Sequence, residues 1–173
     1  PGDTVICTAT ATDIHGGTDT WPDSVSVHNT NPLLTSVVIT PSSGITSTST
    51  LSCTATATDS DGGTPRLTSA WTRRGGVSLG TGTSLTLSAA TVSPGDSVIC
   101  TATATDADGG TDIGSDTVTL GNSDPVMSTV TITPGTGITT STTLTCFATA
   151  TDPDGGTPVL TYAWTRSGGV SLG

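Results

Sequence analysis

The sequence predicts an all-β protein built from repeats of 93 residues in tandem. Thr and Ser together supply 63 of the 173 residues, whereas Glu, Lys and Gln, which favour helices, are absent. Short alternations of apolar and polar residues are separated by turn signals rich in Asp, Gly and Pro, as expected of strands. Residues 1–80 align without a gap on residues 94–173, with 52 identities in 80 positions, which establishes the period.

Charge and hydropathy exclude two classes of protein. The chain carries 14 Asp and 4 Arg, for a formal net charge of −10. Nucleic-acid binding needs clustered Lys and Arg, so we expect no nucleic-acid partner. No apolar run approaches the roughly 20 residues of a membrane span, so we expect none in this window.

The repeat divides the chain into three parts. We expect the end of one repeat at 1–31, a complete repeat at 32–123 and the beginning of another at 124–173. Residues 81–93 of the central repeat have no counterpart in either flank. We therefore interpret the chain as a window cut from a longer array, with both ends falling inside domains.

The strands of the central repeat are justified in order by alternation and by the turns that bound them. In residues 51–58, period two places Cys53 on the inner face with Leu51, Ala55 and Ala57, and the Thr residues on the outer face. Residues 98–105 repeat this pattern, with Val98, Cys100, Ala102 and Ala104 inside. The expected strands are 37–40, 51–58, 67–72, 85–87, 98–105 and 118–120.

The spacing of Cys53, Trp71 and Cys100 resembles the Cys–Trp–Cys pattern of an immunoglobulin-like (Ig-like) antiparallel β-sandwich. The strings at 57–63 and 150–156, each followed by a strand with Trp, are similar to bacterial Ig-like, PKD-like and cadherin-like extracellular repeats. The resemblance implies that 1–31 carries the F and G strands of one sandwich. It also implies that 124–173 carries the A to C strands of another.

Four cysteines allow three pairings, and the resemblance selects Cys53–Cys100 as the disulfide within the central domain. Cys7 and Cys146 then pair with a neighbouring segment or chain. The alternative is four free buried thiols, and a zinc site is disfavoured because no C-x-x-C spacing exists. Disulfides indicate an oxidising compartment, so we expect an extracellular or cell-surface protein.

Turns of the form Asp-x-x-Gly-Gly recur four times, and three of them contain a second Asp. In the topology of the resembled family, the loops at 59–63 and 106–110 lie at the same end of the domain, where the linker 29–32 enters. Converging carboxylates at such a junction suit Ca²⁺, whereas the alternative is a plain hydrogen-bonded turn. The candidate Ca²⁺ ligands are Asp59, Asp61, Asp106, Asp108, Asp152 and Asp154.

Outward-facing Thr residues are candidate acceptors for covalent O-glycans, and two further Thr residues precede Pro. The alternative is a bare Thr-rich sheet, because Thr has a high β propensity. The candidate acceptors are Thr54, Thr56, Thr58, Thr101, Thr103, Thr105, Thr40 and Thr133.

No residue pattern predicts catalysis. His15 and His28 are replaced by Asp108 and Gly121 one period later, and no base is spaced against a nucleophile. We therefore do not expect an enzyme. Trp21 aligns with Gly114, so it is not the core Trp and we expect it in an exposed patch or a contact between domains.

The resemblance implies a structural role, as a repeat unit of an extracellular fibre, pilus-like filament or surface stalk. Its disulfide-clamped domains would be joined head to tail, and its partners would be copies of itself placed end to end. The alternatives are a ligand-binding adhesin repeat, and an accessory module of a secreted enzyme.

Overall fold

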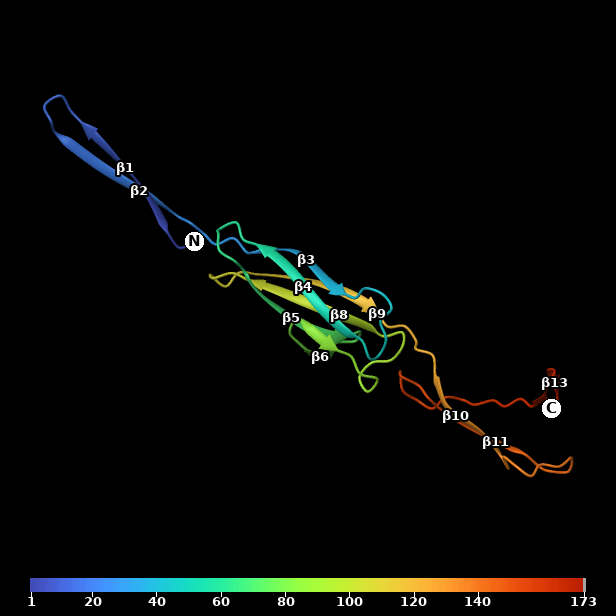
Figure 1. Ribbon diagram of the computed structural model, residues 1–173. Helices are drawn as coiled ribbons and strands as arrows, with labels where there is room; N and C mark the ends of the chain where they lie inside the picture. The colour runs from blue at the N-terminus through green and yellow to red at the C-terminus, as the bar shows by residue number, and fades with distance from the viewer. Residues whose placement is uncertain (173) are drawn as a thin grey trace.

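The computed structural model describes residues 1–172, which form thirteen β-strands and no helix (Figure 1). Every strand pair is antiparallel, which confirms the all-β prediction. Among these residues no helix is long and apolar enough to cross a membrane. The strands are β1 (Thr4–Thr12), β2 (Thr18–Ser26), β3 (Leu33–Thr40), β4 (Thr50–Thr58), β5 (Arg66–Arg73), β6 (Val77–Thr81), β7 (Ser84–Thr86), β8 (Ser97–Thr105), β9 (Thr111–Thr119), β10 (Val126–Thr133), β11 (Thr145–Thr151), β12 (Thr165–Arg166) and β13 (Val170–Ser171).

The molecule is elongated, and its three parts follow one another along a line (Figure 1). The β1–β2 hairpin forms one thin end, and β10 and β11 form the other. The broad middle holds β3 to β9.

The middle part consists of two sheets that enclose one core. One sheet has the order β3-β4-β7, and the other has the order β6-β5-β8-β9. A disulfide joins Cys53 of β4 to Cys100 of β8 and so links the two sheets, with the Cα atoms 6.4 Å apart. The predicted pairing is confirmed. Because the bond closes a span of 47 positions, it is worth about 4 kcal/mol on the loop-entropy estimate.

Trp71 lies at the centre of this core and is fully buried, as predicted. Its indole Nε1 donates a hydrogen bond to the carbonyl of Gly82 at 2.8 Å, which satisfies the only polar atom of its side chain. Apolar side chains from both sheets surround it, among them Ile39, Leu51 and Val98. The two sheets are therefore held by one shared apolar cluster as well as by the disulfide.

The predicted inner face is confirmed in full on β8 and in part on β4. The apolar residues of β8 are buried at every second position, whereas on β4 Leu51 and Cys53 are buried but Ala55 and Ala57 are half-buried. The outer sides differ, because the Thr residues of β4 are exposed and those of β8 are half-buried. β8 has a long partner on each side, β5 and β9, whereas the second partner of β4 is the three-residue β7.

Three strands depart from the sequence expectation. β6 was not expected, β3 begins at residue 33 instead of 37, and β9 covers Thr111–Thr119 where only 118–120 was expected. β9 contains Asp and Gly, which are depleted in strands. It is stabilised by two of its carboxylates, because Asp112 Oδ2 accepts from the N–H of Leu34 at 2.8 Å and Asp116 Oδ2 accepts from that of Ile39 at 2.8 Å.

Each flank holds an antiparallel strand pair that has a counterpart in the middle part. The corresponding pairs in the middle part belong to larger sheets, whereas, among the residues that the structure describes, those in the flanks have no further strand beside them. β1–β2 aligns with β8–β9, and β10–β11 aligns with β3–β4. Residues 159–166 align with β5, but only the last two of them form a strand. The counterpart of β8 is β1, which lies at the opposite end of the molecule (Figure 1), so this segment has no such strand beside it, which accounts for the missing strand.

Candidate functional site

The Asp-rich loops are folded by their own first carboxylate. Asp59 Oδ1 accepts from the backbone N–H two residues later at 2.9 Å, and Asp152 Oδ1 does the same at 2.8 Å. Asp106 Oδ1 accepts from two backbone N–H groups of its loop, including that of Gly110 at 2.7 Å. These are the hydrogen-bonded turns that Asp favours. In the loops at 59 and 152, this leaves the second carboxylate to bind outside its own turn.

The first junction joins the β1–β2 hairpin to the middle part through the first linker, residues 27–32. The side-chain amide of Asn29 donates to Asp106 Oδ2 at 2.9 Å. The backbone N–H of Thr30 donates to Asp61 Oδ2. The linker therefore meets both predicted loops at the same end of the middle part.

Gly110 allows the close approach at this junction. A Cβ built at this residue would lie 2.7 Å from Oδ1 of Asn31 and 2.9 Å from Nδ2 of Asn29. Neither distance leaves room for a side chain, so the linker packs against bare backbone. The Gly-Gly pair of this loop thus serves the contact as well as the turn.

The second junction uses the second linker, residues 120–125, and repeats the bond of the first. The backbone N–H of Ser123 donates to Asp154 Oδ2, and the Ser123 hydroxyl lies 3.3 Å from Oδ1. Ser123 aligns with Thr30 and Asp154 aligns with Asp61. The same bond between linker backbone and loop carboxylate therefore occurs at both junctions, one 93-residue period apart.

Ser47 adds a contact at the second junction. Its side chain is fully buried, and its hydroxyl donates to Asp154 Oδ1 at 2.7 Å. The same hydroxyl lies 3.1 Å from the carbonyl oxygen of Pro153. Ser47 belongs to the loop between β3 and β4, so the middle part holds the following loop directly as well as through the linker.

Hydrogen bonding lowers the pKa of two junction carboxyls. The pKa of Asp154 lies below its usual value mainly because of the Ser47 hydroxyl, and next because of the Ser123 N–H. The pKa of Asp106 is lowered mainly by the Asn29 amide. Donors to a carboxylate favour its charged form, so both groups are held ionised.

The candidate Ca²⁺ ligands are brought together only in part. Asp61 and Asp106 both meet the first linker, whereas Asp59 bonds within its own loop. Among residues 1–172, no group of three or more Asp, His or Cys side chains is arranged to hold a metal ion. The linker contacts of these two carboxylates come from the Asn29 amide and from the backbone N–H and hydroxyl of Thr30, and Ca²⁺ binding stays a prediction.

The other candidate residues are distributed over the surface. In the described part of the chain Cys7 is a free exposed thiol, and Cys146 is a free half-buried one. They lie on β1 and β11, in opposite thin ends of the molecule (Figure 1). Thr54, Thr56 and Thr58 are exposed, as are Thr40 and Thr133, whereas Thr101, Thr103 and Thr105 are half-buried.

Sequence reasoning placed the linker 29–32 at the first junction, but it did not identify the junction bonds of Asn29, Thr30, Ser123 and Ser47. Asn29, Thr30 and Ser123 could have been found, because an Asn followed three residues later by Pro recurs at 29–32 and 122–125 in front of each repeat. Ser47 gave no signal, since one Ser among many in a loop cannot be distinguished without knowing what packs on it. Neither protein-family models nor curated proteins match this chain.

Proposed function

We propose that the chain is a structural, non-catalytic segment of an extracellular rod, made of Ig-like repeats joined head to tail as in a fibre, filament or surface stalk. The observation that carries the proposal is the hydrogen bond from linker N–H to loop carboxylate, which occurs at both junctions one period apart. A contact that recurs with the sequence period points to a repeating join.

The two-sheet middle part supports the Ig-like assignment. Its disulfide links facing sheets, and the buried Trp71 lies in the cluster that contains both bridged cysteines. These are features of Ig-like sandwiches, and they occur here with the strands β3 to β9. A domain with such a clamp resists separation of its sheets when the ends of the chain are pulled.

The junction contacts supply the stiffness that the proposal needs. Each linker is six residues long, and one of its backbone groups is fixed to a loop of the part that follows it. At the second junction, Ser47 ties the same loop to the preceding part. Bending there requires the loss of charge-assisted hydrogen bonds, which are stronger than neutral ones. In an array whose repeats contact only their neighbours, stiffness is set at these junctions.

The disulfide supports an extracellular location, because such bonds persist in oxidising compartments. The formal net charge of −10 argues against binding to nucleic acid, which is also negatively charged. The same charge makes neighbouring molecules repel one another in solution.

Small-angle X-ray scattering tests the rod. The double variant Cys7→Ser/Cys146→Ser cannot form disulfide-linked dimers, and at low protein concentration we expect it to scatter as an elongated particle with a narrow cross-section. Adding Asp61→Ala and Asp154→Ala removes the recurring bond, and we expect the distance distribution to broaden because the junctions bend.

The matched control carries Asp108→Ala and Asp124→Ala, which remove the same charge at exposed residues of a loop and a linker. We expect this control to scatter like the parent variant. Compact scattering from the parent, or equal scattering from both sets of variants, would refute the junction-stiffened rod.

Ca²⁺ and O-glycans stay predictions for the same surfaces. A bound ion would bridge the loops at a junction, so EDTA would lower the melting temperature of the purified chain. Glycans would appear as added mass on the exposed Thr residues of the native material.

A further inference from the structure

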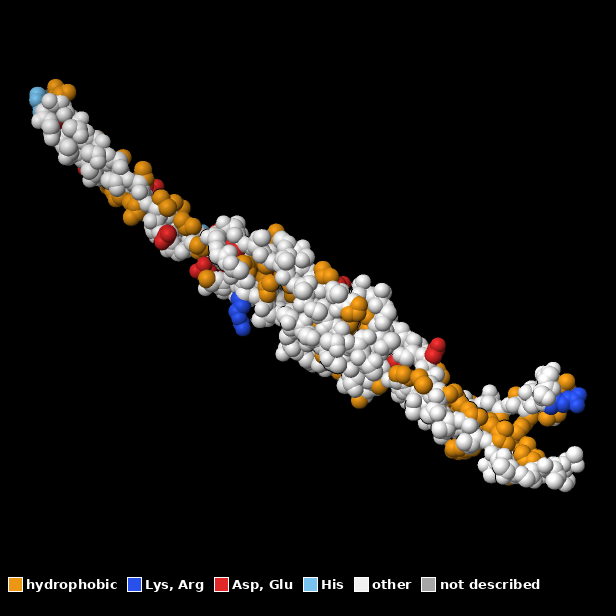
Figure 2. Space-filling model, viewed as in Figure 1, with side chains coloured by type: hydrophobic (Ala, Val, Ile, Leu, Met, Phe, Trp, Pro, Cys, Tyr) orange, Lys and Arg blue, Asp and Glu red, His pale blue; other side chains and the backbone are white. Residues whose placement is uncertain are grey.

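The two thin ends of the molecule expose the faces that the middle part buries. On β1, Val5 is 56% exposed and Cys7 is an exposed free thiol. Their counterparts on β8, Val98 and Cys100, are both 0% exposed. The hairpin is therefore a strand pair whose apolar inner face has nothing packed on it, and Figure 2 shows hydrophobic side chains along this arm.

The opposite end exposes the complementary face. Ile132 on β10 is 50% exposed, whereas its counterpart Ile39 is 1% exposed. Tyr162 is 49% exposed and lies in the segment that aligns with β5 but has no strand beside it. Figure 2 shows hydrophobic side chains gathered over β10 and β11 as well.

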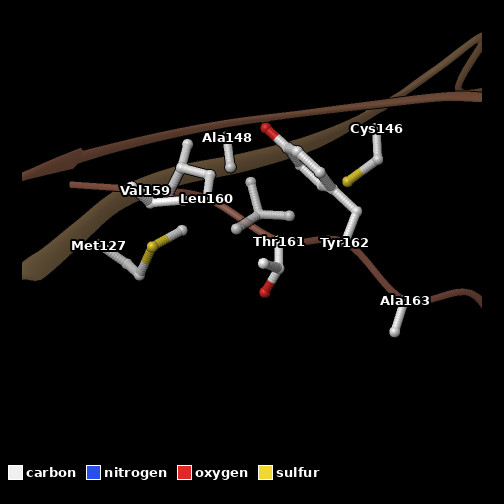
Figure 3. A pocket seen from close by; sticks show the side chains of 9 residues that line it. Met127, Cys146, Ala148, Val159, Leu160, Thr161, Tyr162 and Ala163 are labelled. Carbon is white, nitrogen blue, oxygen red and sulfur yellow. The ribbon is translucent and has the colours of Figure 1, made fainter. Parts of the chain in front are cut away.

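A hollow marks this second face. It has a volume of about 340 Å³ and is lined by residues of β10, β11 and the segment 159–163. Figure 3 shows Met127, Tyr162 and Cys146 around it. Cys146 aligns with Cys53, so the thiol at the rim of this hollow is the counterpart of one that is bonded in the middle part.

We propose that this chain binds a second copy of itself, by docking the β1–β2 hairpin of one copy onto β10, β11 and residues 159–166 of the other. The middle part is the template, because it contains both halves of this contact within one chain. There β5 pairs with β8 in a register that places Trp71 opposite Cys100. One period away, the same register places Trp164 of one copy opposite Cys7 of the other.

Two carboxylates of the hairpin match two backbone donors of the opposite end. In the template, Asp112 and Asp116 each bond the next N–H of β9 through Oδ1 and an N–H of β3 through Oδ2. Asp19 and Asp23 hold the same positions on β2 and make the same Oδ1 bonds.

Within the described residues, no donor meets the Oδ2 atoms of Asp19 or Asp23. The backbone N–H groups of Met127 and Ile132 align with the two that the template carboxylates bind. In the docked pair, Asp19 accepts from Met127 and Asp23 accepts from Ile132. The acceptor carboxylates are thus present on the hairpin, and the donor N–H groups are present on β10 at the other end.

Trp21 gives the docked pair a feature that the template lacks. Trp21 aligns with Gly114, where a Cβ would lie 2.5 Å from Cδ2 of Leu34. The opposite end has Met127 at the position of Leu34, and the unbranched side chain of Met adapts to its neighbours. The 80% exposed indole of Trp21 therefore enters the hollow that Met127 lines.

Docking brings Cys7 of one copy to Cys146 of the other, in the positions of the bonded pair Cys53–Cys100. The two thiols are oxidised to one disulfide by a low-molecular-weight disulfide such as oxidised glutathione. The two protein S–H bonds and the S–S bond of oxidised glutathione break, one protein S–S bond forms, and the two protons and two electrons convert the oxidant into two molecules of reduced glutathione.

The bond joins two copies, because the two cysteines of one chain lie in opposite ends of the elongated molecule (Figure 1). Each joined pair keeps one bare hairpin and one bare acceptor face. Such a head-to-tail contact adds further copies without limit unless it closes a ring. Within the described residues, the joined unit has no match for Leu85, Leu87 and Val92 of the template.

The test traps the contact covalently. The 173-residue chain with Cys7→Ser, whose only free thiol is Cys146, is mixed with an equal amount of the same chain with Cys146→Ser, whose only free thiol is Cys7, in a glutathione redox buffer. Random pairing would make the mixed dimer only twice as abundant as either self-dimer. We expect it to exceed both by roughly tenfold or more, because docking raises the effective concentration of the matched thiols.

A second pair of variants tests the register. Asp19→Asn/Asp23→Asn in the Cys146→Ser copy should lower the yield of mixed dimer severalfold. The matched control Asp108→Asn/Asp124→Asn removes the same charge outside the hairpin and should leave the yield unchanged. Peptide mapping by mass spectrometry should find Cys7 linked to Cys146.

A mixed dimer at no more than the random proportion would overturn the docking. An equal yield from both Asp→Asn pairs would overturn the register. The docking rests on the proposed function for the fold of the repeat, but its failure is separable from failure of the rod, because the scattering experiment uses a dilute variant with neither cysteine, in which no disulfide can link two copies.

Discussion

At the scale of single residues, the Asp-rich loops divide their work between two carboxylates. The first Asp closes the turn, as Asp59 and Asp152 do, and the second binds a linker, as Asp61 and Asp154 do. The strings at 59–63 and 152–156 thus encode both a turn and a join, whereas in the string at 106–110 the first carboxylate, Asp106, does both. The spacing of two places the second carboxylate beyond the turn that the first one closes.

Asp154→Ala should loosen the second junction. The substitution removes the acceptor for the Ser123 N–H, and we expect the amide hydrogen of Ser123 to exchange roughly tenfold faster, since hydrogen bonds to charged groups are the stronger class. NMR-detected hydrogen exchange measures this. Asp108→Ala, in a comparable loop, should leave the Ser123 rate unchanged, and an unchanged rate in Asp154→Ala would contradict the assignment.

Acid should loosen the same junctions. The pKa values of Asp154 and Asp106 are lowered in the folded chain, so their contribution to order is complete above the unfolded Asp value of about 3.9. It is lost as the pH falls through the lowered folded values. Amide chemical shifts of Ser123, followed from pH 6 to pH 2, should therefore move mainly below about pH 4. A midpoint above that value would contradict the direction of the shift.

At the scale of elements, β3 and β9 meet at the open edge of the middle part without forming a ladder. Carboxylates of β9 accept from the backbone of β3, and Gly114 lets the side chain of Leu34 reach the surface of β9. Two residue types that are poor strand formers thus join the two sheets at this edge. Tertiary contacts override local propensity here.

Gly114→Ala should destabilise the middle part by about 1–3 kcal/mol, because the added Cβ would lie 2.5 Å from Cδ2 of Leu34. Urea unfolding measures the loss. In a Leu34→Ala background, the same substitution should cost much less, because the obstructing atom is gone.

Gly121→Ala is the control for that comparison, since its Cβ would meet its nearest neighbour, the carbonyl oxygen of Ile45, at 3.6 Å. Ala in such a space is neutral or stabilising by about 0.4–1 kcal/mol. Equal losses at residues 114 and 121 would show that close approach to Leu34 is not the cause.

The sequence was sufficient for the parts of the fold that depend on local pattern. Alternation identified β4 and β8, and the Cys–Trp–Cys spacing identified the disulfide partners and the buried Trp71. The extent of β9 could not be predicted, because it depends on donors from a strand more than seventy residues away. The contact of Ser47 with the loop at 154 could not be predicted for the same reason.

At the scale of the whole molecule, both docking ends are acidic. Residues 1–31 carry four Asp and no Arg, and residues 124–173 carry three Asp and one Arg. The ends of two copies therefore repel each other before their apolar faces touch. Apolar burial and strand pairing, rather than attraction between charges, must drive the contact.

Salt should accordingly speed the formation of the mixed dimer of Cys7→Ser and Cys146→Ser. Raising the ionic strength from about 0.01 M to about 1 M shortens the screening length from roughly 30 Å to roughly 3 Å and weakens the repulsion. Non-reducing gel electrophoresis over time gives the rate. Slower formation at high salt would indicate that opposite charges pair across the contact, contrary to the composition of both ends.

The two ends of the molecule are unlike, because one is the β1–β2 strand pair and the other combines the β10–β11 pair with the extended segment 159–164 (Figure 1). In a chain of docked copies, all molecules would point the same way. One end of the chain would then present a free β1–β2 hairpin and the other a free acceptor face, so the two ends could not bind the same partner. Anything that anchors or stops such a chain must recognise one end or the other.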